Sequence, residues 1–398
     1  MISSSLKEVV IVSEITATYF FKGKVADPKP FAEKLAVGLT VGSWTELTEL
    51  DQQHLAAYKG RVVQAEQQPD GLYIKIAYPD KNVTPDFSSI LTTIFGKLSL
   101  DGAVKLIDID LGDYTRHFPG PAFGIEGIRR QLDVEARPLV MSIFKGIIGR
   151  NLEFFKEQLR AQALGGVDVI KDDEILYDVP ELPFEERISA AAAVLKEVED
   201  ATGHKVLYAV NLSGPVFQLK DKAMRAKELG ATAILFNVHA YGLDVLKGIR
   251  ELNIGLPILA HPAFAGALAG SDSYGISYPL LISKLARLAG ADLILFPAPY
   301  GSVPLDEQEA EKIVQAARSE AAVPRAFPVP SAGIHPGLVS RLIDDFGHDI
   351  VINAGGGVHG HPDGAAAGGR AFFEAIDLYE GKAAGTAYEK AVKQWGTS

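Results

Sequence analysis

The hydrophobic positions of this chain follow two alternating patterns from about Pro138 onward. Short apolar runs are separated by longer amphipathic stretches, as the strands and helices of a parallel α/β fold require. We expect eight strands, at 138–144, 168–172, 205–211, 231–238, 257–262, 293–298, 326–331 and 349–354. We expect helices between them at 152–164, 183–202, 219–229, 243–252, 280–288, 307–321 and 338–346.

Eight strand–helix units with right-handed crossovers close most simply into a (β/α)₈ TIM barrel. An open doubly wound sheet is the alternative, but the order of the runs shows no switch point. The preceding region predicts strands at 11–21, 61–67 and 72–78 and helices at 30–39 and 88–98. The fold class is therefore α/β, with a smaller α+β N-terminal domain (1–123) and a C-terminal barrel (124–398). The segment 117–121, rich in proline and glycine, marks the boundary region at the end of the first domain.

Composition narrows the class of protein. The 398 residues accommodate a barrel of about 250 residues and a companion domain. A net charge of -11, without a basic run containing aromatic residues, argues against a nucleic-acid partner. The chain has no cysteine, so disulfides and thiolate metal sites are excluded. Neither a signal segment nor a long apolar run is present, so we expect no membrane partner and a cytoplasmic location.

The end of the second predicted strand carries an unusual cluster of charge. Lys171 and Asp173 point the same way because side chains alternate along a strand, and Glu174 can turn inward where the strand becomes a loop. A neutral lysine amine can add CO₂ and become an anionic carbamate, an oxygen ligand of the kind Mg²⁺ prefers. A solvated acidic turn is the alternative, which the position beside Lys171 disfavours.

Other polar residues follow the remaining strands, at the end of the barrel where such enzymes carry out their chemistry. They are Lys145, Asn211, His261, Ser331, Gly333 and the run Gly355 to Gly357. Glycines after strands seven and eight often bind phosphate through backbone N–H groups, which implies a phosphorylated substrate. A plain tight turn is the alternative for the glycine run, and a buried core residue is the alternative for His261. We interpret His359 and His361 as loop residues rather than metal ligands.

Taken together and in this order, the motifs resemble the RuBisCO superfamily. The closest resemblance is to its RuBisCO-like branch in methionine salvage, the 2,3-diketo-5-methylthiopentyl-1-phosphate enolases. The resemblance rests on the segments 42–45, 95–102, 137–146, 165–174, 260–262, 330–337 and 353–362.

The resemblance implies a head-to-tail homodimer in which one subunit's N-terminal domain covers the partner's barrel. Lys97 would act across this interface as the catalytic base. Lys171 is similar to the lysine that is carbamylated, with Asp173 and Glu174 completing the Mg²⁺ ligands. The residues expected to bind the phosphorylated diketone are Lys145, Lys171, Asp172, Asp173, Glu174, His261, Ser331, Gly333, Gly355 and Gly356.

Departures from the carboxylase pattern favour the enolase branch. The loop after strand six, 296–302, lacks the mobile lysine that true carboxylases hold there. Gly38 stands where the carboxylases carry a glutamate, and Lys97 stands where they carry an asparagine. His239 also departs from the aromatic residue expected in close relatives. The alternatives are an isomerase of 5-methylthioribulose 1-phosphate, a carboxylase, and a non-catalytic sugar-phosphate-binding regulator.

Overall fold

The computed structural model describes residues 14–42, 48–303 and 305–397. The chain divides into two compact units, one comprising 1–117 with 268–277 and the other comprising 118–267 with 278–398. The excursion 268–277, which leaves the barrel sequence to join the first unit, was not anticipated from the sequence. We therefore keep the bounds 1–123 and 124–398 as a proposal for the two main domains, and this proposal does not account for the segment 268–277.

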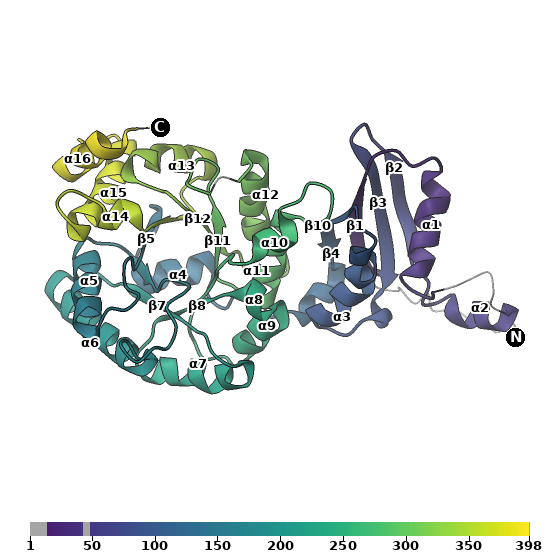
Figure 1. Ribbon diagram of the computed structural model, residues 1–398, viewed down its shortest axis with the longest axis horizontal. Helices are drawn as coiled ribbons and strands as arrows, with labels where there is room; N and C mark the ends of the chain where they lie inside the picture. Colours follow the sequence, from purple (N-terminus) through teal and green to yellow (C-terminus); the bar gives the residue numbers. More distant parts are fainter. Residues whose placement is uncertain (1–13, 43–47, 304, 398) are drawn as a thin grey trace, which may run out of the picture. The chain divides into compact units, whose positions relative to one another are not determined.

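The first unit is built on a five-stranded sheet in the order β10-β4-β1-β3-β2 (Figure 1). The strands are β1 (Glu14–Lys22), β2 (Arg61–Gln67), β3 (Gly71–Pro79), β4 (Val104–Asp110) and β10 (Gly275–Ile276). β1 pairs antiparallel with β3 and β4, whereas the short β10 pairs parallel with β4. The predicted strands at 61–67 and 72–78 are confirmed. β4 was missed, and the first residues of the strand predicted at 11–21 lie outside the described part of the chain.

The helices of the first unit are α1 (Pro28–Gly38), α2 (Glu49–Leu55) and α3 (Phe87–Leu91). The single helix predicted at 88–98 is divided. α3 continues into a π-helical segment, Thr92–Gly96, and a 3₁₀ turn follows at Leu98–Leu100. Lys97 lies between these two segments. Single-turn π segments occur frequently at functional sites, which makes this break in the helix relevant to Lys97.

The second unit contains an eight-stranded parallel sheet in the order β12-β11-β9-β8-β7-β6-β5-β13, and β12 and β13 at its two ends lie against each other (Figure 1). The predicted (β/α)₈ barrel is confirmed. Its strands are β5 (Leu139–Ile143), β6 (Val169–Lys171), β7 (Leu207–Asn211), β8 (Ala233–Phe236), β9 (Ile258–Ala260), β11 (Leu293–Pro297), β12 (Phe327–Ser331) and β13 (Val351–Ala354).

Helices surround this sheet, and every predicted helix is present within a few residues. They are α5 (Leu152–Leu164), α6 (Phe184–Thr202), α7 (Leu219–Glu228), α9 (Leu243–Glu251), the π-helical segment Pro279–Lys284 with α11 (Leu285–Ala289), α12 (Glu307–Arg318) and α13 (Val339–Phe346). Those not predicted are α4 (Gly124–Leu132), α8 (Val238–Tyr241), α10 (Ala265–Ala269), α14 (Gly356–His359), α15 (Ala365–Tyr379) and α16 (Thr386–Trp395). None of the helices in the described residues is long and apolar enough to cross a membrane.

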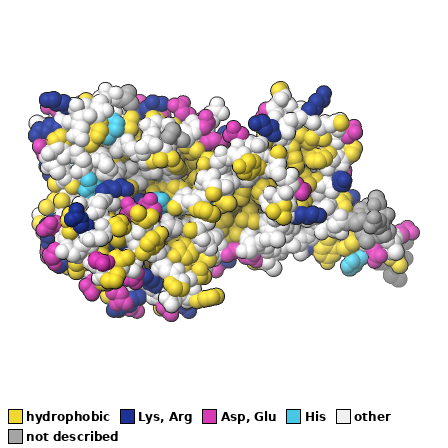
Figure 2. All heavy atoms as spheres, in the orientation of Figure 1, with side chains coloured by type: hydrophobic (Ala, Val, Ile, Leu, Met, Phe, Trp, Pro, Cys, Tyr) yellow, Lys and Arg dark blue, Asp and Glu magenta, His cyan; other side chains and the backbone are white. Residues whose placement is uncertain are grey.

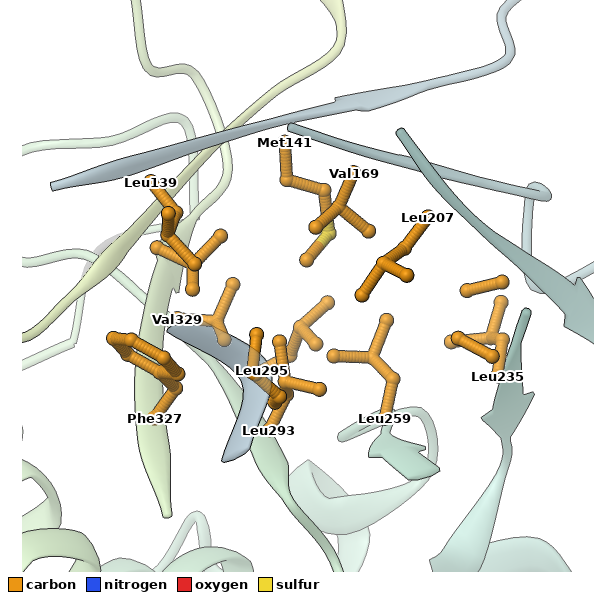
Figure 3. Close-up of a cluster of buried hydrophobic side chains, with 14 of the residues drawn as sticks. Leu139, Met141, Val169, Leu207, Leu235, Leu259, Leu293, Leu295, Phe327 and Val329 are labelled. Carbon is orange, nitrogen blue, oxygen red and sulfur yellow. The ribbon is translucent and has the colours of Figure 1, made fainter. Parts of the chain in front are cut away.

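Alternate residues of the barrel strands form its core. Figure 3 shows Leu139 and Met141 from β5 meeting Val169 from β6 and Leu207 from β7 inside the sheet, with the side chains of the other strands. Strand side chains alternate between the two faces of a sheet, so this inward phase continues along each strand toward its C-terminal end. On six of the eight strands the next inward position is polar, namely Lys171, Asn211, Asn237, His261, Ser331 and Asn353.

Candidate active site

Four neighbouring strands direct polar side chains at Glu174, which follows β6. The Glu174 carboxylate lies 3.4 Å from the Lys171 amine of β6 and 3.3 Å from Nε2 of His261, which follows β9. Its backbone carbonyl accepts hydrogen bonds from the side chains of Asn211 on β7 and Asn237 after β8, at 3.0 and 3.1 Å. Figure 2 shows basic, acidic and histidine side chains gathered near the middle of the barrel unit. The strand order brings these residues together although 90 positions separate Lys171 from His261.

Lys171 is fully buried, and its amine donates to the Asp172 carbonyl at 3.0 Å as well as to Glu174. Burial lowers the pKa of Lys171, and the neighbouring carboxylates of Glu174 and Asp173 only partly oppose that shift. A lowered pKa increases the share of neutral amine. The neutral amine is the form that adds CO₂, so the local chemistry is compatible with the predicted carbamate.

Lys145 connects the charged cluster to the glycine loop that follows β13. Its amine lies 3.3 Å from Asp173 Oδ2. Its stem lies against Gly355, where an added Cβ would come within 2.7 Å of the Lys145 Cε. Glycine at this position therefore leaves room for the lysine to pass.

His261 is held in one tautomer by its two contacts. Its Nδ1 accepts the backbone N–H of Ala263 at 3.2 Å, so the proton of the neutral ring is on Nε2, facing Glu174. Burial lowers the pKa of His261, and the positive charge of Lys171 lowers it further. For Glu174, burial would raise the carboxyl pKa, but the charge of Lys171, other neighbouring charges and a backbone hydrogen bond together outweigh burial, so the net shift is downward. The site thus pairs a neutral imidazole with an ionised carboxylate.

The residues at the end of β6 fit a hard divalent cation only when Lys171 is modified. Among the described residues, no three His, Cys, Asp or Glu side chains are grouped so as to hold a metal ion. Lys171, Asp173 and Glu174 are adjacent, and two of them already offer carboxylate oxygen. A carbamate on the buried Lys171 amine would supply the third anionic oxygen ligand.

Asp172 was expected to bind substrate, and its position corrects that expectation. Its side chain is fully buried with the opposite phase to Lys171. It accepts hydrogen bonds from the Tyr208 hydroxyl at 2.7 Å and the Asn211 backbone N–H at 2.9 Å, and it forms an ion pair with the buried Arg187 at 3.1 Å. Both oxygens are therefore engaged away from the barrel interior, and Asp172 has a structural role.

The predicted phosphate-binding residues lie in two loops that follow adjacent strands. Ser331 and Gly333 end or follow β12, and Gly355 and Gly356 follow β13. Gly333 has a φ of +86°, and an added Cβ would lie 2.6 Å from the Ser302 backbone nitrogen, so a side chain is excluded. A Cβ at Gly356 would meet no atom within 4 Å, which leaves its backbone accessible. The Ser331 hydroxyl donates to the Phe296 carbonyl at 2.8 Å.

Lys97 belongs to the first compact unit, so its approach to the barrel residues stays a prediction. It is exposed and lines a cavity of about 460 Å³ whose apolar walls include Phe21, Phe31 and Leu35.

In the 42–45 segment of the resemblance, residues 43–45 lie outside the described part of the chain. His359 and His361 each direct a ring nitrogen to a backbone carbonyl, of Ile143 at 2.8 Å and Ala387 at 2.9 Å.

Asn237 was missed by the sequence analysis, and Asn211 was noted without a role. The signal was available in the alternation along the strands. Asn237 is two residues beyond Leu235, which faces the barrel core, so it shares that inward phase. The strand was predicted to extend to 238, which placed Asn237 within the strand rather than directly after its end, and Asn237 was therefore overlooked.

A (β/α)₈ barrel with a buried lysine, carboxylates and a histidine at its C-terminal strand ends defines a barrel protein with an enzyme-type site. The model of the ribulose bisphosphate carboxylase (RuBisCO) large chain catalytic domain matches 124–395, and that of its N-terminal domain matches 11–113. The chain belongs to the RuBisCO large chain family.

Several relatives are similar over nearly their whole length. A 2,3-diketo-5-methylthiopentyl-1-phosphate enolase from Geobacillus thermodenitrificans is 53% identical, covering 97% of this chain and 98% of the relative. One from Bacillus pumilus is 54% identical, covering 92% and 93%. The crystal structure of a RuBisCO-like protein (MtnW) from Alicyclobacillus acidocaldarius has a TM-score of 0.90 and 45% identity, covering 96% of this chain and all of that chain. A RuBisCO from Pyrococcus horikoshii has a TM-score of 0.89 at 31% identity, covering 96% and 94%.

Proposed function

We propose that this protein is a 2,3-diketo-5-methylthiopentyl-1-phosphate enolase, an isomerase of methionine salvage. It converts its diketone substrate to 2-hydroxy-3-keto-5-methylthiopentenyl 1-phosphate by moving one proton. Relatives with this name are more than half identical to the chain along its length. The observation that carries the proposal is the buried Lys171 amine beside Glu174 and His261, at the barrel end where the reacting groups are needed.

Mg²⁺ would be held by carbamylated Lys171, Asp173 and Glu174. When bound, it supplies positive charge that offsets the negative charge developing on the substrate oxygens during enolisation. The protein residues perform the remaining tasks. Burial would raise the Glu174 pKa, but the Lys145 ammonium, which remains when Lys171 is carbamylated, lowers it and so helps to keep this carboxylate ionised.

Lys97, in its neutral form, would take the proton from the carbon next to the substrate carbonyl and hold it as an ammonium. His261 would meet a substrate oxygen through its Nε2–H, the same proton that now faces Glu174. Lys145 would contribute a positive charge between the cluster and the phosphate. Ser331, Gly333, Gly355 and Gly356 would orient the phosphate, with accessible backbone at Gly356 supporting this role.

The active form would be a homodimer in which Lys97 acts on the partner's barrel. The loops after the barrel strands expose several large apolar side chains, as expected of a surface that another protein covers. They are Ile148, Ile175, Tyr177, Phe217 and Phe264. This apolar rim supports a covering partner subunit around the candidate site.

The direct test is ultraviolet detection of the enol product from the diketone phosphate. Full turnover is expected with Mg²⁺ and bicarbonate together, and strongly reduced turnover when either is omitted. Full activity in CO₂-free buffer with Mg²⁺ alone would remove the carbamate from the proposal. No enol under any of these conditions would remove the activity itself.

A carboxylase is disfavoured by the loop that follows β11. The segment 298–303 contains no lysine, so the positive side chain that would steady a bound CO₂ is missing. We expect no incorporation of ¹⁴CO₂ into ribulose 1,5-bisphosphate. Detectable incorporation would favour the carboxylase alternative.

A further inference from the structure

Two buried carboxamides from neighbouring strands donate to a single backbone carbonyl. Asn211, at the end of β7, donates from Nδ2 to the Glu174 carbonyl at 3.0 Å and to the Leu176 carbonyl at 3.1 Å. Asn237, directly after β8, donates to the same Glu174 carbonyl at 3.1 Å. The β6–α6 loop is thus tied at Glu174 to the two strands that follow it around the barrel.

The surroundings of these carboxamides indicate a specific role for the donors. Asn211 is fully buried and Asn237 is nearly so. The partners determine the orientation of each side-chain amide. A backbone carbonyl oxygen can only accept a hydrogen bond, so the amide atom that faces it must be the donor Nδ2. Both Oδ1 atoms are buried without a hydrogen-bond partner. A buried unsatisfied oxygen is costly, so these two asparagines are poor choices for packing alone.

The position of Glu174 explains the need for such a tie. Its carboxylate is on a loop, where the backbone is freer than on a strand, whereas Lys171 is held by β6 itself. Fixing the Glu174 carbonyl restricts the orientation of its peptide group and therefore the direction of its side chain. The two rigid strands that follow β6 in the sheet, β7 and β8, provide the anchor points.

We propose that Asn211 and Asn237 are positioning residues that fix the Glu174 carboxylate for a divalent cation. This inference rests on the proposed function, because it assumes that Glu174 is a cation ligand. Neither asparagine touches the cation or substrate. They act through the main chain of Glu174, and Asn211 has the larger effect because it also holds Leu176.

The test is the Mg²⁺ affinity of the full-length protein, measured by calorimetry at saturating bicarbonate. Leucine has nearly the shape of asparagine and no donor, so Asn211→Leu and Asn237→Leu remove the contacts with little change in volume. We expect each variant to bind Mg²⁺ about 10- to 100-fold more weakly, with the larger loss for Asn211→Leu. The ¹³C resonance of a carbamate formed from labelled bicarbonate should persist in both, because Lys171 is part of β6 itself.

Asn353→Leu is the matched control. Asn353 is an equally buried asparagine on β13 whose side chain has no hydrogen-bond partner. Its Mg²⁺ affinity should equal that of the unmodified protein. Unchanged affinity in the Asn211→Leu, Asn237→Leu double variant overturns the positioning role, and so does an equal loss in the control. Absence of Mg²⁺ binding by the unmodified protein would instead overturn the proposed function.

Discussion

At the scale of single residues, environment gives similar side chains different tasks. Lys171 is buried and its pKa is lowered by desolvation, which suits reaction with CO₂. Lys145 is half-exposed and forms an ion pair with Asp173. Asp172 and Asp173 are adjacent, yet only Asp173 points toward the cluster, because strand alternation sends Asp172 to Arg187.

Lys97→Ala should reduce kcat by about 10²- to 10⁴-fold, because the proposed general base is removed. Mg²⁺ binding by calorimetry should be unchanged, since the proposed ligands are all in the barrel. Lys97→Arg should be equally inactive, because a guanidinium stays protonated.

Lys34→Ala is the matched control for this prediction. Lys34 lines the same cavity as Lys97 and is also exposed. Its variant should retain turnover. Wild-type kcat in Lys97→Ala would eliminate Lys97 as the base.

His239 should make the folded state sensitive to acid. Burial lowers its pKa from 6.5 to about 4, so the folded protein disfavours the protonated ring. The stability contributed by the neutral ring is complete above about pH 6.5 and is lost as the pH falls toward 4. Between pH 7 and 4.5 the free energy of unfolding should fall in the unmodified protein and fall less in His239→Gln. The two decreases should differ by on the order of 2 kcal/mol. Parallel urea titrations of metal-free protein at the two pH values measure this difference, and equal losses in the two proteins would contradict it.

At the scale of elements, the β6–α6 connection is held on both faces of the sheet. Inside the barrel, Asn211 and Asn237 hold the Glu174 carbonyl. Outside it, Asp172 at the end of β6 joins Arg187 of α6 and Tyr208 of β7. Burial would lower the Arg187 pKa, but Asp172 and Tyr208 together outweigh burial and the net shift is upward.

Arg187→Leu should lower the free energy of unfolding by about 3–5 kcal/mol, because it leaves the buried Asp172 carboxylate without its counter-charge. Arg160→Leu breaks the exposed ion pair with Glu197 and should cost less than about 1 kcal/mol. Urea denaturation compares the two variants. Similar losses from both would show that the buried pair has no special role.

At the scale of the whole molecule, the proposed site requires residues of two subunits. Lys97→Ala and Lys171→Met should each be inactive alone. If Lys97 acts on the partner's barrel, co-expression should restore up to about a quarter of wild-type activity, because half of randomly formed dimers are hybrids with one intact site each. Native mass spectrometry verifies the hybrid dimers.

The control for this experiment is a hybrid dimer in which each subunit carries a different substitution in its barrel. A hybrid of Lys171→Met and Glu174→Gln has no intact barrel, so its activity should stay at background. If the Lys97→Ala and Lys171→Met hybrid is equally inactive, Lys97 does not act across the dimer.

Much of the barrel could be predicted because its signals are local. Alternation between short apolar runs and amphipathic helices located all eight barrel strands, and the polar or glycine-rich ends of six of them marked the site. Errors arose where local pattern is ambiguous. The 88–98 helix is interrupted by a π segment, and β4, a strand of mixed apolar and charged residues, was missed.

The sequence by itself determined the barrel, its open end and the residue types there, since hydrophobic periodicity and strand alternation are properties of neighbouring residues. Only the tertiary structure decided which polar groups meet. The convergence of Asn211, Asn237 and His261 on Glu174, and the removal of Asp172 from the site, depend on the order and register of strands far apart in the chain. Those contacts follow from closure of the sheet, which no local pattern encodes.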